Sequence, residues 1–172
     1  MSYNYAEIID EQINSKERNK FITDIAQQEI KAGRKVLILT KRVCHYEELH
    51  QRLSEDGARD GNIKISSSDS QAERAELMAD LRSNSRPFDC LLGTYSLLAT
   101  GFDVPELDTL IFAGDLKSDV LQEQSAGRVL RLLEGKKDPQ IIDIVDKRNS
   151  ILYRQAKARQ KFYKLQGWVD RN

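Results

Sequence analysis

Five short, uninterrupted apolar runs divide the chain, and they constrain its fold more than any other feature of the sequence. They are VLILT (residues 36–40), IKIS (63–66), FDCLLGT (88–94), LDTLIFAG (107–114) and QIIDIV (140–145). Runs without polar alternation are typical of strands in a parallel sheet, because helices cover both faces of such a sheet. We therefore expect a strand at each of these positions.

The segments between the runs have the spacing of helices. In residues 16–32, Phe21, Ile25 and Ile30 fall roughly on one stripe, and Gly33 follows as a favourable end to the helix. Residues 43–54 follow the first expected strand directly and predict a second helix.

Three more helices are expected further along the chain. Ser70 and Glu73 form a capping-box pattern that starts a helix ending near Ser83. Residues 118–133 and 147–166 predict two others, the last of them long and basic. Helices that alternate with strands predict a doubly wound α/β sandwich, with a mainly parallel sheet of about five or six strands and helices on both faces. Any site should lie at the carboxyl ends of the strands.

Length and composition fit one domain over residues 1–172, of which 40% are hydrophobic and 31% charged. No apolar run approaches the ~18 residues of a membrane span and the start has no signal-peptide pattern, so we expect a cytoplasmic protein without membrane contact. Cys44 and Cys90 stand far apart and outside any CxxC pair, which predicts buried, reduced thiols. His45 and His50 lack partners at metal-ligand spacing, so we interpret them as surface or helix-cap histidines and expect no metal site.

The charge is unevenly distributed, although the whole chain has a net charge of zero. Residues 147–172 carry eight basic residues and one acidic residue, so the rest of the chain has a net charge of −7. A basic end of this kind can contact a polyanion, but a solvated helix face also explains such a run.

The stretch QSAGRVLR places four chemically distinctive residues on one face of the helix expected at 118–133. Gln124, Gly127, Arg128 and Arg131 follow the spacing i, i+3, i+4 and i+7. Two guanidiniums on one face repel each other unless an anion lies between them. They could bridge to surface carboxylates, or they could bind phosphate oxygens through forked, charge-assisted hydrogen bonds.

Small polar residues fill the loop between the third and fourth expected strands. Thr94, Ser96 and Thr100 offer hydroxyls to a sugar-phosphate backbone, Gly101 permits a tight turn, and Asp103 suits ribose hydroxyls. The loop could also be a simple connection.

A third group, Thr40, Lys41 and Arg42, leaves the first expected strand at its carboxyl end. The two cations could bind phosphates or belong to a solvated loop.

Together these stretches resemble the second lobe of superfamily 2 helicases. LILTKRVCHYEEL is similar to motif IV, GTYSLLATGFDVP to motif V, and QSAGRVLR to motif VI in its Q-x-x-G-R-x-x-R form. The resemblance runs from about residue 16 to residue 168 and is nearest to DEAD/DEAH-type DNA helicases and translocases. It implies a RecA-like three-layer sandwich and ATP hydrolysis coupled to movement along nucleic acid, with DNA favoured over RNA.

The resemblance also implies residue roles. Arg131 matches the arginine finger that reaches the γ-phosphate of ATP, and Arg128 matches a companion phosphate contact. Gln124 matches a polar residue on the nucleotide side, with Gly127 beside it. All four residues lie in motif VI.

Motifs IV and V carry the other implied contacts. Asp103, with Gly101, matches the part of motif V that contacts the ribose or couples it to motif VI. Thr94 matches the residue whose hydroxyl contacts the nucleic-acid backbone, and Ser96 and Thr100 are further candidates for this contact. Eight residues separate Thr94 from Asp103, one more than in many relatives, so the choice among these three hydroxyls stays open. Thr40, Lys41 and Arg42 match the motif IV strand end, where backbone contacts are common.

No G-x-x-x-x-G-K-[ST] loop occurs in the sequence, so the chain lacks the usual cradle for the β- and γ-phosphates and Mg²⁺. The acidic pair in IIDEQI (residues 8–13) has too short an apolar lead for a Walker B strand. We therefore expect a first RecA-like lobe, in the same parent chain or a separate subunit, to hold ATP and Mg²⁺. Alone, the chain should not hydrolyse ATP. The alternatives are a stand-alone, non-catalytic module that binds nucleic acid or regulates a partner, and an unrelated nucleotide- or flavin-binding α/β domain.

Overall fold

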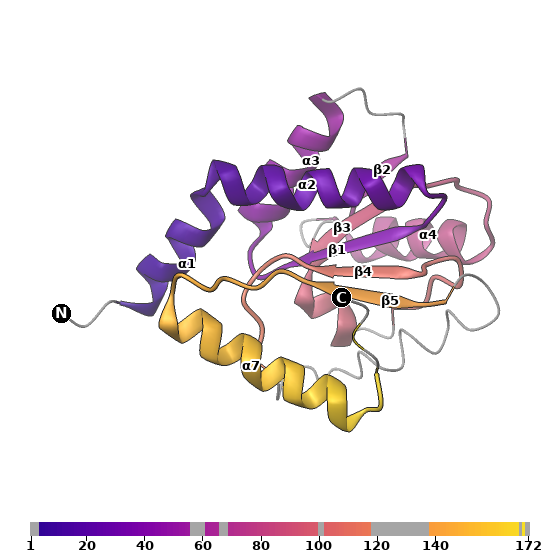
Figure 1. The fold of residues 1–172 in the computed structure, drawn as a ribbon. Helices are drawn as coiled ribbons and strands as arrows, with labels where there is room; N and C mark the ends of the chain where they lie inside the picture. Colours follow the sequence, from indigo (N-terminus) through magenta and orange to yellow (C-terminus); the bar gives the residue numbers. More distant parts are fainter. Residues whose placement is uncertain are drawn as a thin grey trace.

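The expected strands form one parallel sheet with the order β2-β3-β1-β4-β5 (Figure 1). The structure is a computed structural model that describes residues 4–55, 61–65, 69–99, 102–117, 138–168 and 170. Its elements, in chain order, are α1 (Tyr5–Asn14), α2 (Lys16–Lys31), β1 (Val36–Thr40), α3 (Val43–Glu55), β2 (Asn62–Lys64), α4 (Gln71–Arg82), β3 (Cys90–Thr94), the 3₁₀ helix η1 (Tyr95–Ala99), β4 (Thr109–Phe112), β5 (Gln140–Asp143) and α7 (Ser150–Leu165).

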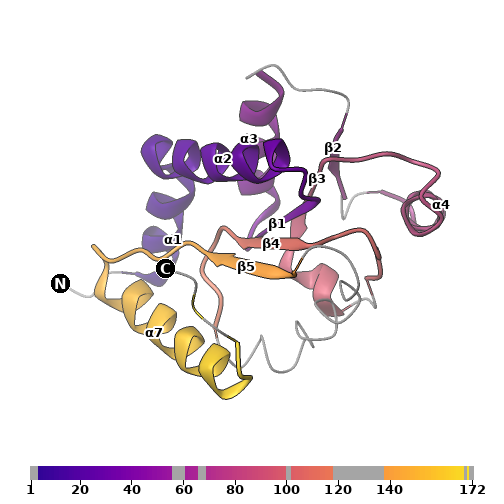
Figure 2. The same cartoon turned by 45° about the vertical axis from the view of Figure 1, so that its right-hand side comes forward.

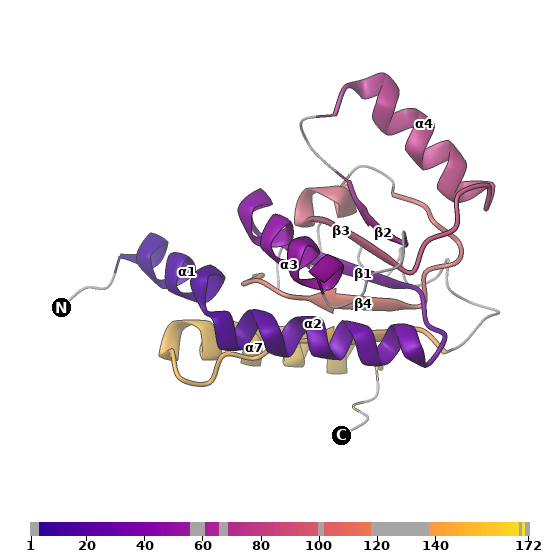
Figure 3. The same ribbon diagram turned by 90° about the horizontal axis from the view of Figure 1, so that it is seen from above.

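Helices cover both faces of the sheet, as the unbroken apolar runs predict. Helices α2 and α3 lie on one face, and α7 lies on the opposite face (Figures 1 and 2). Helix α3 runs beside α2, as the view from above shows (Figure 3). Helix α4 packs on the same side as α7, through Leu77 and Met78. The α/β sandwich expected from the sequence is confirmed.

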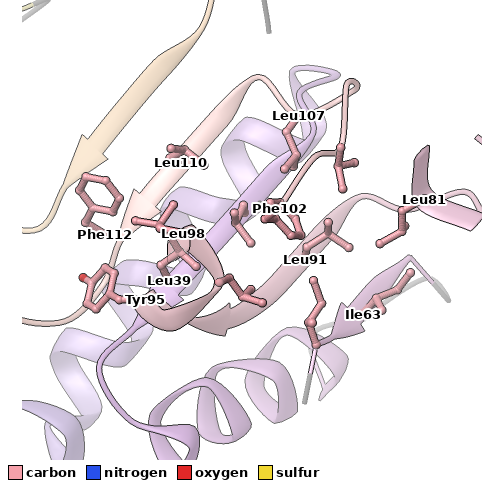
Figure 4. Packing of buried hydrophobic residues seen from close by; sticks show 14 of the residues in the cluster. Leu39, Ile63, Leu81, Leu91, Tyr95, Leu98, Phe102, Leu107, Leu110 and Phe112 are labelled. Atoms are coloured by element: carbon pink, nitrogen blue, oxygen red, sulfur yellow. The ribbon is translucent and has the colours of Figure 1, made fainter. Parts of the chain in front are cut away.

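The core forms because successive residues of each strand point to opposite faces of the sheet. In β1, Leu37 and Leu39 join the cluster that α7 covers, whereas Val36 and Ile38 join the cluster under α2 and α3. The first cluster includes Phe102, which comes three residues after the end of η1 in the sequence (Figure 4). Strand β1 lies in the middle of the sheet and is buried along its whole length.

Two predicted helix ends are confirmed by their caps, and a third is corrected. The Ser70 hydroxyl accepts from Glu73 N and the Glu73 carboxylate accepts from Ser70 N, which completes the capping box of α4. Gly33 has a φ of 82°, the left-handed conformation that glycine adopts most readily after a helix. The last helix begins at Ser150 rather than 147, because the Asn149 side chain caps it by accepting from Ile151 N and Leu152 N.

Helix α1 was not expected from the sequence. IIDEQI lies within this helix, which Asn4 caps, so it is not a strand. Its buried residues Ile8, Ile9 and Ile13 pack against Leu152 of α7 and form a small separate cluster.

The predicted inward stripe of α2 is partly wrong. Phe21 is 56% exposed, whereas Ile25 and Ile30 are partly buried. The inward face instead consists of Asn19, Ile22, Thr23 and Ala26. Two polar residues can occupy it because each makes a hydrogen bond there: Asn19 Nδ2 donates to Ile13 O at 2.8 Å, and Thr23 Oγ1 donates to Lys20 O at 3.0 Å.

Two expectations of burial are also corrected. Cys44 is exposed at the start of α3, whereas Cys90 is buried in β3, where burial raises the pKa of its thiol. His45 is fully buried rather than at the surface, because Asn19 of α2 offers it a hydrogen-bond partner. No helix among the described residues is long and apolar enough to cross a membrane. The helix expected at 118–133 lies outside the described residues.

Candidate nucleotide and nucleic-acid site

The parallel register brings the ends of the strands to one edge of the sheet. Thr40 of β1 pairs with Thr94 of β3, and Phe112 of β4 pairs with Asp143 of β5. The loops after these strands therefore leave from the same edge, which we call the carboxyl edge. Of the predicted site residues, Thr40, Lys41, Arg42, Thr94 and Ser96 lie at this edge.

Thr40 shapes the turn after β1. Its side chain is fully buried, and Oγ1 donates to Arg42 O at 2.9 Å. The strand end of β4 passes close to this turn at Gly114, where a Cβ atom would lie 3.1 Å from Lys41 N. The Thr40 hydroxyl is thus engaged within the chain, which leaves Lys41 and Arg42 as the outward groups of this turn.

Lys41 and Arg42 are both paired with acidic residues of the same chain. Lys41 Nζ donates to Tyr5 OH at 2.9 Å and lies 3.6 Å from Asp115 Oδ2. Arg42 donates to the Asp10 carboxylate on α1. Both cations remain partly exposed, so a phosphate could replace or join these carboxylates.

Thr94 and Ser96 face outward while the residue between them anchors the loop. Their hydroxyl oxygens lie 2.7 Å apart in a hydrogen bond. Tyr95 points into the core, where its hydroxyl donates to Gly114 O at 2.6 Å and accepts from Gly114 N at 3.2 Å. Burial raises the pKa of Tyr95, so this hydroxyl stays protonated. The alternation of polar and aromatic residues thus turns two hydroxyls outward and the tyrosine ring inward.

Asp103 has an unsatisfied acceptor. Phe102 and Val104 on either side of it are buried in the core. The Oδ1 atom of Asp103 is buried and has no hydrogen-bond partner among the described residues. A buried carboxylate oxygen of this kind fits a hydroxyl donor such as that of a ribose. Gly101 and Thr100, the neighbouring predicted site residues, lie outside the described residues.

The four residues of the QSAGRVLR stretch, Gln124, Gly127, Arg128 and Arg131, also lie outside the described residues. The described chain extends to Lys117, and the two residues before it form hydrogen bonds with the terminal helices. Leu116 O accepts from Arg159 Nη1 of α7 at 2.9 Å, and Asp115 N donates to Gln12 Oε1 of α1 at 3.3 Å. The two terminal helices therefore fix the end of the chain segment that leads toward the arginines.

A buried ionic group at the carboxyl edge was not predicted from the sequence. Arg159 Nε and Nη2 donate to the two Asp143 carboxylate oxygens at 2.8 and 2.9 Å, and Tyr163 OH donates to Asp143 at 2.7 Å. Burial opposes the charge of Arg159, but its hydrogen bonds with Asp143 outweigh that cost and raise its pKa. The spacing in the sequence could have indicated that Arg159 is buried, because it lies between Ala156 and Phe162 on the apolar face of α7.

A second buried polar group joins α2, α3 and the end of β5. Arg18 donates to both oxygens of Asp146, at 2.7 and 3.0 Å. His45 Nε2 lies 2.9 Å from Asn19 Oδ1, and burial, followed by the nearby Arg18 charge, lowers the pKa of His45 to about 4. The other histidine, His50, bonds Asn62 O at 3.2 Å. No group of three or more potential metal ligands occurs in the described part of the chain.

An all-parallel five-stranded sheet with helices on both faces is a doubly wound α/β fold. Residues 5–133, well over half of the chain, match the family of the helicase conserved C-terminal domain. The chain belongs to this family and is a C-terminal lobe of a superfamily 2 helicase.

Individual relatives agree with this assignment. The chain is 30% identical over 156 residues to the probable helicase D10 of Escherichia phage T5, covering 90% of this chain and 33% of the relative. It is 23% identical over 158 residues to the ATP-dependent DNA helicase uvsW of Enterobacteria phage T4, covering 90% and 30%. The chain thus spans about a third of the length of these relatives.

Solved structures share the fold. The crystal structure of T4 UvsW matches with a TM-score of 0.76 and 21% identity over 98% of this chain and 37% of that one. Dbp5 of S. cerevisiae, solved bound to RNA and ADP BeF3, matches with a TM-score of 0.64 and 18% identity over 89% of this chain and 37% of that one.

Proposed function

We propose that the chain is the second motor lobe of an ATP-dependent superfamily 2 helicase or translocase. The observation that carries this proposal is the family match over residues 5–133, which includes the whole QSAGRVLR stretch. The complete enzyme would hydrolyse ATP between this lobe and a first RecA-like lobe, in the same parent chain or in a separate subunit.

In this arrangement the chain contributes charge to a nucleotide held mainly by the other lobe. Arg131 donates to the γ-phosphate and Arg128 to a neighbouring phosphate oxygen, with Gln124 and Gly127 on the same helix face. ATP with Mg²⁺ supplies the phosphoryl group for transfer. Guanidiniums aimed at that group stabilise the negative charge that develops on it.

The unsatisfied Asp103 oxygen supports a ribose contact in the same composite site. A carboxylate oxygen accepts from a hydroxyl, and a buried acceptor without a partner is costly unless a ligand satisfies it. Gly101, next to the expected turn, would let the nucleotide approach the main chain.

The outward groups of the carboxyl edge would hold the nucleic-acid backbone. Thr94 and Ser96 present two adjacent hydroxyls, and Lys41 and Arg42 present cations that can exchange their carboxylate partners for phosphates. Thr100, four residues after Ser96 in the sequence, is a third candidate for this contact. Contacts to phosphates carry no sequence information, so we expect binding that is independent of sequence and weakens with salt. DNA is the favoured substrate.

The test reconstitutes the chain with its first lobe and measures ATP hydrolysis stimulated by DNA or by RNA. Arg131→Ala should lower turnover by roughly a thousandfold, the scale of an arginine finger. Arg86→Ala is the matched control, because Arg86 is exposed on the loop after α4, far in sequence from the QSAGRVLR stretch. Turnover of Arg131→Ala equal to that of the control would overturn the proposal. Greater stimulation by RNA than by DNA would reverse the assigned substrate.

The chain without a first lobe provides a second test. Because it has no phosphate-cradling loop, we expect no hydrolysis of ATP by residues 1–172 alone. Hydrolysis that persists after purification and is lost in Arg131→Ala would show that this chain holds a complete site.

A further inference from the structure

Helix α7 lacks acidic residues altogether. No Asp or Glu occurs from residue 147 to residue 169, a segment that contains seven Lys and Arg residues. Arg159 is the buried member of this set and pairs with Asp143. The other six cations are exposed: Lys147, Arg148, Arg154, Lys157, Lys161 and Lys164.

Four of the exposed cations form a row on one side of the helix. Arg154, Lys157, Lys161 and Lys164 follow the spacing i, i+3, i+7 and i+10, which keeps them within one face. The buried residues Leu152, Ala156, Arg159 and Phe162 lie on the opposite face, against the rest of the protein. We call the row of four cations the α7 basic face. At 1.5 Å per residue it is about 15 Å long.

The α7 basic face lies on a helix without acidic residues, whereas α2 and α3 carry acidic residues among their cations. On α2, Lys20 pairs with Asp24 at 2.6 Å, and on α3, Arg52 pairs with Glu48 at 2.8 Å. None of the four cations of the α7 basic face has a carboxylate within 4.0 Å in the described part of the chain. Like charges three or four residues apart destabilise a helix, so such a row is unfavourable without an anion outside it.

We propose that the α7 basic face binds the phosphate backbone of double-stranded nucleic acid. The proposal rests on the proposed function and adds a duplex contact away from the outward groups of the carboxyl edge. A duplex carries one negative charge per ~1.7 Å of its axis, so a row about 15 Å long meets several phosphates. Helix α7 begins beside α1, next to the carboxyl edge, and runs along the side of the lobe that bears β5 (Figures 1 and 2).

The side chains of the α7 basic face favour a duplex over a single strand. Single-strand sites usually combine cations with aromatic side chains on which bases stack. The aromatic residues near this helix are already packed: Tyr163 stacks on Trp168 with ring centroids 5.6 Å apart, and Phe162 is buried. Tyr153 lies beside the α7 basic face, but its ring already contacts Lys157, whose Nζ lies 5.2 Å from the ring centroid. The face therefore presents mainly cations to a row of phosphates.

The test uses a variant that neutralises the whole row, Arg154→Gln, Lys157→Gln, Lys161→Gln and Lys164→Gln combined. A matched control removes four exposed cations elsewhere: Lys16→Gln, Lys31→Gln, Arg82→Gln and Arg86→Gln combined. Binding of the 172-residue chain to a fluorescent 20-base-pair duplex, and to one of its strands alone, is measured by anisotropy at several salt concentrations. Circular dichroism and urea unfolding check that both variants are folded.

Neutralising the row should lower duplex affinity at least tenfold at low salt. It should also reduce the slope of log affinity against log salt concentration by roughly 3 to 4, since each phosphate contact contributes about 0.9. The control should retain most of its affinity and a slope within about 1 of the unchanged chain. No duplex binding by the unchanged chain, equal losses in both variants, or a loss confined to single-stranded DNA would each overturn the inference. These outcomes are independent of the Arg131→Ala turnover, which tests the motor function separately.

Discussion

Arg159 and Asp143 form a forked ion pair that joins the last helix to the edge strand of the sheet. The two hydrogen bonds, of 2.8 and 2.9 Å, lie in a region where Arg159 is only 3% exposed. The third nitrogen of Arg159 donates to Leu116 O, beyond the end of β4. One guanidinium therefore connects α7, β5 and the segment that leads toward Arg128 and Arg131.

Arg159→Met should strongly destabilise the protein. It removes one partner of a buried ion pair and leaves the Asp143 carboxylate without its cation, a change that costs about 3 to 5 kcal/mol. Urea unfolding followed by circular dichroism measures this loss. Arg154→Met is the matched control on the same helix, because Arg154 is exposed, and its effect should stay within about 0.5 kcal/mol. Similar losses in the two variants would contradict the role of the pair.

Stability should fall as the pH drops below about 6.5, because His45 resists protonation in the folded state. Its pKa is lowered from 6.5 to about 4, so the unfolded chain binds a proton in this range and the folded chain does not. The contribution of His45 is fully present above pH 6.5 and is lost progressively toward pH 4, by about 3 kcal/mol at most. Urea unfolding at a series of pH values measures it.

Burial and the nearby Arg18 charge keep His45 neutral, and the hydrogen bonds of Asn19 fix which ring nitrogen carries the proton. Asn19 Nδ2 donates to Ile13 O, so its oxygen faces His45 and must accept from Nε2–H. The Nδ1 atom is buried and has no partner in the part of the chain that the structure describes, so a proton there would be an unsatisfied donor. His45→Gln should flatten the dependence of stability on pH between 6.5 and 4. An equally steep loss of stability in His45→Gln would assign the effect to other groups.

The Ser70 capping box should stabilise α4 by about 1 kcal/mol, the usual effect of an N-cap hydroxyl. Ser70 Oγ accepts from Glu73 N at 3.2 Å, and Ser70→Ala removes this acceptor from the first turn. Ser70→Asp supplies another acceptor and should retain most of the stability. Urea unfolding compares the three proteins. A loss in Ser70→Asp as large as that in Ser70→Ala would show that the cap does not act through this bond.

Much of the fold could be predicted because it depends on local patterns. The unbroken runs VLILT and QIIDIV marked buried parallel strands, and Gly33 and Ser70 marked helix ends, since each signal lies within a few residues. The strand-end residues Thr40 and Thr94 could be placed together because parallel strands end at one edge. The resemblance to family motifs supplied expected roles for residues whose function the spacing alone did not decide.

Other features depend on partners far away in the sequence. Asn19 and His45 are buried together only because α2 and α3 pack side by side, and neither residue looks apolar. Phe21, by contrast, is exposed although its helical spacing suggested burial. The partners of Lys41 and Arg42 are Asp115, beyond β4, and Asp10, on a helix that the sequence did not predict.

Tyr95→Phe should destabilise the carboxyl edge by about 1 to 3 kcal/mol, because the Tyr95 hydroxyl bonds both the N–H and the C=O of Gly114. Its removal leaves two buried main-chain groups unpaired while the aromatic ring can keep its contact with Phe112. Urea unfolding gives the total loss, and hydrogen exchange should be faster at the Gly114 amide. Tyr153→Phe is the control, since the Tyr153 hydroxyl has no hydrogen bond among the described residues. Unchanged exchange at Gly114 in Tyr95→Phe would show that the anchor between η1 and the end of β4 is not formed in solution.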